Sequence, residues 1–298
     1  MRALLWFLGA VVGTLVLAAL VAYPVWQLAH ALQPDWPFHK VVSRLWQLLL
    51  VGGIVFAVRG LRLSAREDWG YGLPRARFLR QAGAGFAIGL ATMLPMSFAM
   101  VALGIYAPED GFGPATLLRF AAAGAAVGLA VAVVEETFFR GLVFRAVLRE
   151  SGLAAAVAGS ALFYAAIHFF ARARLGDDDI GWGSGFDLLR AALTRFADPA
   201  SIVDAFVTLV LVGLLLALVR HRTGGIAAGI GLHAGWVCVM KATRWSTAPA
   251  EDARWSLLVS GFDGYTGWLV AAWAALLLLA AVALGWLRPR PAVSGARG

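Results

Sequence analysis

Two adjacent glutamates, Glu135 and Glu136, stand in an apolar stretch of the chain that Arg140 closes. An ionisable side chain inside such a stretch is costly, so it marks a candidate functional site. Residues four apart share one face of a helix, which lets Glu136 pair with Arg140, whereas Glu135 points about 100° away. We predict that Glu136 is structural and that Glu135 faces a polar interior cavity. A purely structural cluster of all three residues is the alternative.

The five histidines divide in the same way. His168 and His233 lie inside apolar stretches, and either one taken alone is more often a hydrogen-bonded interior residue than a catalyst. The other three lie in predicted loops or turns, and we interpret them as solvated, with no chemistry implied. They are His30, His39 and His221.

Spacing around a predicted turn brings His168 to the depth of Glu135. Glu135 lies sixteen residues before Ser151, and His168 lies seventeen residues after it. At a rise of about 1.5 Å per residue, an antiparallel hairpin places both roughly 24–25 Å from the turn. We therefore expect their side chains to lie close enough to share one water. His233 also lies well inside its apolar stretch, which we interpret below as a membrane helix. Gly231 and other glycines around it let this helix approach neighbouring helices closely.

One carboxylate and two imidazoles that converge inside a membrane can act as a general base and hold a water or stabilise an oxyanion. The same three residues, Glu135, His168 and His233, are the ligands that a zinc ion would use. Catalytic zinc needs three good protein ligands, and the chain has no H-E-x-x-H motif and only one cysteine, Cys238. We expect no cofactor, with metal dependence as the alternative.

The elements that position these residues are predicted to be membrane helices. The 298 residues are 61% hydrophobic and only 14% charged, which leaves too little polar surface for a soluble particle. We predict an all-α polytopic membrane protein with about eight transmembrane helices in a single membrane domain, 1–298. The expected spans are 3–25, 44–58, 82–105, 117–139, 153–171, 202–219, 225–243 and 265–287. The first span is too long for a signal peptide and is expected to be retained.

Arginine sets the expected orientation. The segment 59–80 holds six arginines, whereas 106–116 holds two acids and no basic residue. Cytoplasmic loops are enriched in arginine and lysine, so we place 59–80 and both termini in the cytoplasm, and 106–116 and 172–200 outside. The last segment carries four arginines but also five aspartates. The net charge of +8 follows this membrane pattern and not a DNA-binding stripe, so we expect no nucleic-acid partner.

An amphipathic helix is predicted in the segment 184–200. Apolar residues recur there at helical spacing, with charged residues elsewhere on the helical wheel. The apolar positions are Phe186, Leu189, Leu193 and Phe196. We interpret this helix as a surface connector, and alternatively as a lid beside a substrate entrance.

The charged residues resemble the motifs of a known family. The run from Glu135 to Arg140 looks like the E-E-x-x-x-R motif of the CAAX-protease and bacteriocin-processing family, also called Abi or type II CAAX endopeptidases. Tyr164 and His168 resemble its F-x-x-x-H motif, with Tyr replacing Phe, and His233 resembles its third motif. The motifs occur in family order within a predicted catalytic core, 117–243.

The resemblance implies an eight-helix intramembrane endopeptidase that depends on glutamate. Glu135 would activate water together with His168, and His233 would help to form the oxyanion site, with Glu136, Arg140 and Tyr164 in support. The family's third motif usually ends H-x-x-x-N, but position 237 is Val here. Valine cannot donate a side-chain hydrogen bond, and loss of one oxyanion donor typically costs a factor of about 10²–10³.

The resemblance further implies a membrane-bound or membrane-tethered peptide substrate. Family substrates are prenylated C-a-a-X proteins, but abundant Arg, Ala and Trp with only two Lys are typical of a high-GC bacterium, where a C-terminal sorting tail is a plausible target. We expect membrane lipids as partners and the bacterial cytoplasmic membrane as the location. A non-catalytic bacteriocin-immunity or scaffold protein is the main alternative. A transporter is disfavoured because no half-repeat is evident.

Overall fold

The computed structural model describes residues 2–170, 175, 180–250 and 253–287, and helices dominate them. The α-helices are α1 (Arg2–Leu32), α2 (Phe38–Gly60), α3 (Arg75–Ala102), α4 (Pro114–Glu135), α5 (Phe144–Phe170), α6 (Ser184–Thr194), α7 (Val203–Thr223), α8 (Ala227–Ser246) and α9 (Trp268–Ala283). Two short strands, β1 (Tyr106–Pro108) and β2 (Thr247–Pro249), pair antiparallel and join the ends of α3 and α8. The all-α membrane fold predicted from the sequence is confirmed.

Five helical segments in the described part of the chain are long and apolar enough to cross a membrane. One of them, Pro114–Phe169, comprises two antiparallel arms, because Gly152 adopts a left-handed conformation (φ 81°) that reverses the chain. The predicted turn near Ser151 is therefore confirmed. Helix α9 is apolar but shorter than the five. The number of eight spans stays a prediction.

Helix α8 lies between α3 and α4, and small residues allow the three backbones to approach closely. A Cβ added to Gly231 would lie 1.9 Å from the Ala82 carbonyl oxygen of α3. A Cβ on Gly128 of α4 would lie 2.5 Å from the carbonyl oxygen of Ala234. The predicted close packing around His233 is thus confirmed, and it fixes the helix that carries this histidine.

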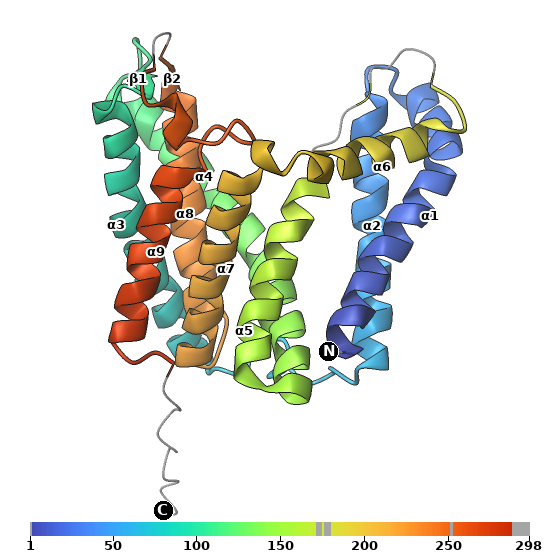
Figure 1. Cartoon of the computed structure of the whole chain (residues 1–298), viewed down its shortest axis with the longest axis horizontal. Coiled ribbons are helices and arrows are strands. Elements are labelled where there is room, and N and C mark those ends of the chain that lie inside the picture. Colours follow the sequence, from blue (N-terminus) through green and yellow to red (C-terminus); the bar gives the residue numbers. More distant parts are fainter. Residues whose placement is uncertain (1, 171–174, 176–179, 251–252, 288–298) are drawn as a thin grey trace, which may run out of the picture.

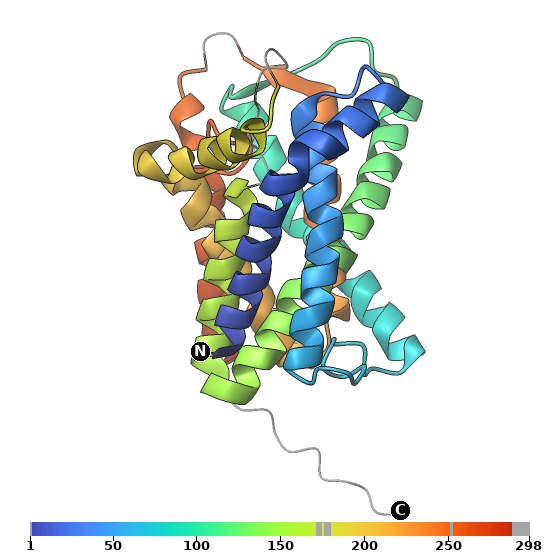
Figure 2. The same cartoon turned by 90° about the vertical axis from the view of Figure 1, so that its right-hand side faces the viewer.

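The α1–α2 hairpin forms the other side of the molecule (Figures 1 and 2). Its α1 packs against α2 and α5, and Phe7 makes an edge contact with Phe138 at 5.7 Å between ring centroids. Helix α2 begins at Phe38, six residues before the predicted span. The added residues include the exposed Lys40, whereas Val41 and Val42 beside it are buried, so one face of this extension packs although it carries a charge.

Helix α6 crosses the ends of the other helices and connects the two sides (Figure 1). It ends at Thr194, before the predicted limit of 200, and a 3-10 turn, Arg195–Ala197, follows it. Pro199 disfavours a helical conformation of Asp198, so the helix does not continue to 200.

The predicted apolar stripe of α6 packs only in part, because Leu189 and Phe196 are half-buried and Phe196 contacts the Phe169 ring. Phe186 and Leu193 are exposed, whereas Gly185 packs on the backbone of α1 at Ala19. The role of this helix as a lid stays a prediction.

The arginine-rich segments share one end of the bundle, the lower end in Figure 1. Arg145, beside the turn at Gly152, donates to Asp68 of the α2–α3 connection at 3.1 Å. The backbone N–H of Ile226, between α7 and α8, donates to Gly70 of the same connection at 3.2 Å. A single orientation of the protein therefore places all of these arginine-rich segments on the same side of the membrane.

We expect Ala65 and Phe112 to lie on opposite sides of the membrane, with Ala65 in the cytoplasm. The α2–α3 connection and the β1–α4 connection occupy opposite ends of α3, and the arginines select the cytoplasmic end. Fusions of a reporter that is active only in the cytoplasm, or only outside it, would measure this. Equal signals from the two positions would contradict the arrangement.

Candidate active site

The α4–α5 hairpin brings Glu135 and His168 together. The His168 Nε2 atom lies 3.9 Å from Glu135 Oε1, which confirms the proximity predicted from their equal distance to the turn. His233 of α8 approaches the other carboxylate oxygen, with 3.8 Å between its Nε2 atom and Glu135 Oε2. Both gaps are too long for a direct hydrogen bond. Glu135 and His168 remain partly accessible, with side chains 24% and 27% exposed.

Glu136 points into the protein and is fully buried, as predicted. Its Oε1 atom lies 3.3 Å from Arg140 Nη1, so the expected pair forms. The same oxygen also accepts a hydrogen bond from His233 Nδ1 at 3.1 Å, a contact that the sequence did not reveal. Glu136 therefore holds His233 as well as Arg140.

Arg140 is fully buried between helices. Its guanidinium carbon lies 4.4 Å from the centroid of the Tyr164 ring, and Nη2 donates to the Gly213 carbonyl of α7 at 3.2 Å. The Tyr164 ring in turn meets the His168 ring edge-on, with 4.4 Å between centroids. The motif residues thus form one stack that runs from Glu136 to His168.

The helix between α4 and α5 is not a regular α-helix. Residues Glu136–Val143 form a π-helix, η1, although the sequence predicted an α-helix there. Such segments are rare and occur often at functional sites. Arg220 of α7 donates from Nε to the Arg140 carbonyl at 3.0 Å, which satisfies a backbone group in the altered segment. A Cβ on Gly141 would lie 2.5 Å from the Trp69 carbonyl oxygen, so a neighbouring loop also fits closely.

Hydrogen bonds fix the proton positions on both histidines. His168 Nδ1 lies 2.8 Å from the Tyr164 carbonyl oxygen, which can only accept, so this nitrogen carries a proton. His233 Nδ1 faces the Glu136 carboxylate and is likewise the donor. In a neutral imidazole the other nitrogen has a lone pair. Both Nε2 atoms therefore present acceptors to Glu135 when the rings are neutral.

Two further features of the site had no clear sequence signal. Gly229 lies where the Glu136 carboxylate needs space, since an added Cβ would lie 2.9 Å from Glu136 Oε2. Thr137 contacts the Tyr71 hydroxyl at 2.7 Å, which ties η1 to the α2–α3 connection. The sequence predicts only that the glycines around His233 allow neighbouring helices to approach closely. The place of Gly229 beside the carboxylate was not foreseen.

The other histidines and Val237 lie apart from this cluster. His30 is exposed, whereas His39 and His221 are only half-exposed, so the prediction that all three are solvated was too simple. Val237 is buried on α8, one helical turn beyond His233. Within the described ranges, no group of three His, Cys, Asp or Glu residues has the arrangement of a metal site.

The model of a family described as type II CAAX prenyl endopeptidase Rce1-like matches residues 117–239. This segment is Rce1-like. It begins in α4 and ends within α8, so the Rce1-like region contains Glu135, His168 and His233. The family resemblance inferred from the motifs is confirmed, and it supports a protease-type enzyme in the membrane. No curated protein and no solved structure matches the chain.

Proposed function

We propose that this protein is a glutamate-dependent intramembrane endopeptidase that cleaves a membrane-bound or membrane-tethered peptide, such as a C-terminal sorting tail. One observation supports this most strongly. The Glu135 carboxylate lies between two imidazole nitrogens, at 3.9 and 3.8 Å, within the Rce1-like segment. A polar gap of this length is one that a bridging water can span.

The proton positions suggest how a water would be activated. Glu135 and the Nε2 lone pair of His168 can each accept one hydrogen of the same water, which leaves the oxygen free to attack a peptide carbonyl carbon. Glu135 takes the proton as the carbon–oxygen bond forms. It then gives that proton to the leaving nitrogen as the carbon–nitrogen bond breaks, which yields a new amine and a new carboxylic acid, and the acid loses its remaining proton to solvent.

His233 is positioned to stabilise charge near the reacting carbonyl. Its Nδ1 proton is held by Glu136, so its Nε2 atom can donate to an oxyanion only when the ring is an imidazolium. Glu135 and Glu136 lie on either side of the ring and compensate that positive charge. The buried Glu136–Arg140 pair keeps this arrangement fixed, as the close packing of α8 also does.

The test compares the membrane proteomes of cells that lack the protein, cells that carry it and cells that carry Glu135→Gln. We expect at least one membrane protein to lose a terminal segment only in the presence of the unaltered protein, measured by mass spectrometry of peptide ends. Identical peptide ends in the last two samples would favour the non-catalytic alternative, which Val237 also favours.

A chelator added to membranes that contain the unaltered protein tests whether cleavage depends on a metal ion. We expect cleavage to continue, because the proposed route uses Glu135 and His168 as bases and leaves them unavailable as ligands. Loss of cleavage that zinc restores would instead assign Glu135, His168 and His233 to a metal.

A further inference from the structure

The oxyanion of the proposed reaction needs hydrogen-bond donors, and few groups around Glu135 have one to spare. Val237 has none. His168 uses its Nδ1 proton on the Tyr164 carbonyl, and His233 uses its Nδ1 proton on Glu136. When neutral, both rings therefore turn an acceptor toward the site.

Arg140 cannot supply the missing donor either. Its side chain is fully buried, with Nη1 beside Glu136 and Nη2 on the Gly213 carbonyl. The Tyr164 ring covers the guanidinium at 4.4 Å. The substrate would have to displace this ring before it reached the arginine.

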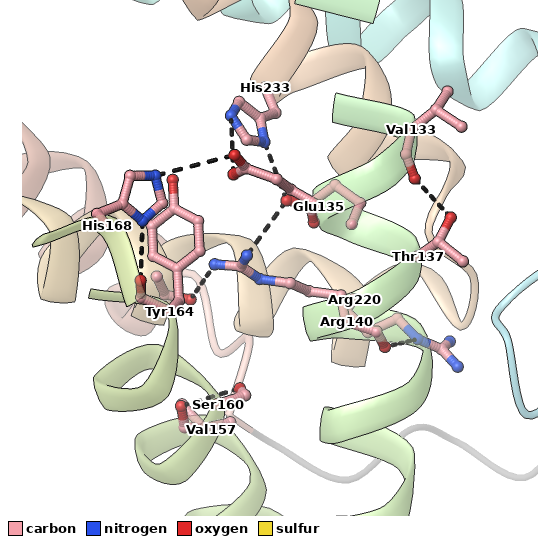
Figure 3. A network of polar contacts seen from close by, with 12 residues as sticks. Val133, Glu135, Thr137, Arg140, Val157, Ser160, Tyr164, His168, Arg220 and His233 are labelled. Carbon is pink, nitrogen blue, oxygen red and sulfur yellow. Dashed lines mark hydrogen bonds and ion pairs between the residues drawn. The ribbon is translucent and has the colours of Figure 1, made fainter. Parts of the chain in front are cut away.

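The Tyr164 hydroxyl is different. Figure 3 shows it pointing toward the space between His168 and the Glu135 carboxylate. The residue is only 3% exposed. Among the described residues, no hydrogen-bond partner of this hydroxyl is found, although other buried tyrosine hydroxyls have one, such as Tyr265 on Ser97 at 2.7 Å. The Tyr164 hydroxyl is not one of the fully buried side-chain atoms that lack a partner, so it keeps some exposure toward the site and is free to donate to a bound substrate.

We propose that the Tyr164 hydroxyl donates a hydrogen bond to the carbonyl oxygen of the scissile bond and stabilises its negative charge in the tetrahedral intermediate. A tyrosine hydroxyl keeps its proton at neutral pH, so it donates whatever the charge of the histidines. Contacts with Arg140 on one side and His168 on the other fix the ring in advance. Preorganised donors of this kind stabilise charge that develops during the reaction.

This role also connects the two departures from the family motifs. Position 237 has lost an amide donor, and position 164 carries a hydroxyl where the motif has phenylalanine. Val237 lies one turn from His233 on α8, and Tyr164 lies one turn from His168 on α5. The Tyr164 hydroxyl on α5 would then donate the hydrogen bond that the family's asparagine on the helix of the third motif is expected to donate.

The test uses Tyr164→Phe, which removes only the hydroxyl and keeps both ring contacts. The purified protein in vesicles would be given a quenched-fluorescent peptide. The peptide reproduces the cleavage site that the comparison of membrane proteomes has identified. We expect kcat to fall by about 10²–10³-fold with KM and thermal stability nearly unchanged, because the donor acts on the developing charge and not on the bound peptide.

Tyr265→Phe is the matched control, since it removes the hydroxyl of another fully buried tyrosine. It should lower thermal stability and leave kcat unchanged. This role of Tyr164 rests on the proposed function, and Glu135→Gln separates the two. Glu135-dependent cleavage with a wild-type kcat for Tyr164→Phe would overturn the Tyr164 role alone. Cleavage that does not depend on Glu135 would overturn both.

Discussion

Glu135→Gln is expected to lower kcat by about 10²–10⁴-fold while leaving the protein folded. This is the range that general acid–base groups contribute. Glutamine keeps the shape of glutamate and its ability to form hydrogen bonds, but it cannot take a proton from water. The Glu135 carboxylate makes no direct hydrogen bond to either histidine, at 3.9 and 3.8 Å, so little packing depends on its charge. Peptide cleavage per amount of folded protein measures the effect.

The histidine variants complete this experiment. His168→Ala should be comparably damaging, because the attacking water would lose its second acceptor. His233→Ala should reduce kcat less than Glu135→Gln does, but it should also lower the protein yield, since it leaves a buried Glu136 without its donor. Glu109→Gln, in an exposed loop, controls for the loss of one negative charge. A wild-type kcat for Glu135→Gln would rule out the glutamate mechanism.

Glu136→Gln is expected to destabilise the protein by about 3–5 kcal/mol, which is typical when one partner of a buried ion pair is removed. Both Glu136 and Arg140 are fully buried, so the guanidinium would remain charged without compensation. Glutamine can still accept a hydrogen bond from His233, so the loss of stability measures the contribution of the Glu136 negative charge. Thermal unfolding in detergent and the yield of folded protein measure it. Activity should fall as well, because Arg140 supports the Tyr164 ring.

Asp187→Asn is the matched control, because it makes the same chemical change in an exposed pair with Arg190 on α6. That pair should contribute no more than about 1 kcal/mol. The double variant Glu136→Gln, Arg140→Met should be less damaging than Glu136→Gln alone, since it removes both charges. Equal stability of Glu136→Gln and the unaltered protein would show that the buried pair contributes little.

Much of this site could be predicted from the sequence, because a membrane leaves few places for charge. Glu135 and His168 were identifiable as ionisable residues inside apolar runs, and counting residues from one turn placed them at one depth. The bond between Glu136 and His233 was not predictable in this way. It depends on the rotation of α8 about its own axis, which packing of Gly231 and Gly128 against neighbouring backbones determines.

The errors in the predicted fold have local physical causes. The π-helical segment was missed, since the same residue types form an α-helix as readily and only tertiary contacts, such as Arg220 on the Arg140 carbonyl, favour the wider turn. In α6 the helix was predicted correctly by spacing, but only part of the expected apolar stripe packs, and the buried residues are Ser184, Gly185, Leu188 and Ala192. In a membrane protein an apolar face can lie toward lipid, so hydrophobicity does not tell which face lies inside.

The π-helix between Glu136 and Val143 has a consequence for how the chain tolerates changes in length. A segment that takes more residues per turn behaves like an α-helix with an extra residue accommodated in it. Loss of one residue there would restore regular backbone hydrogen bonding, yet it would rotate Glu135 by about 100° relative to the turn at Gly152. The more regular helix would then be the inactive one. In this segment, local stability and the alignment of the charged residues favour different chain lengths.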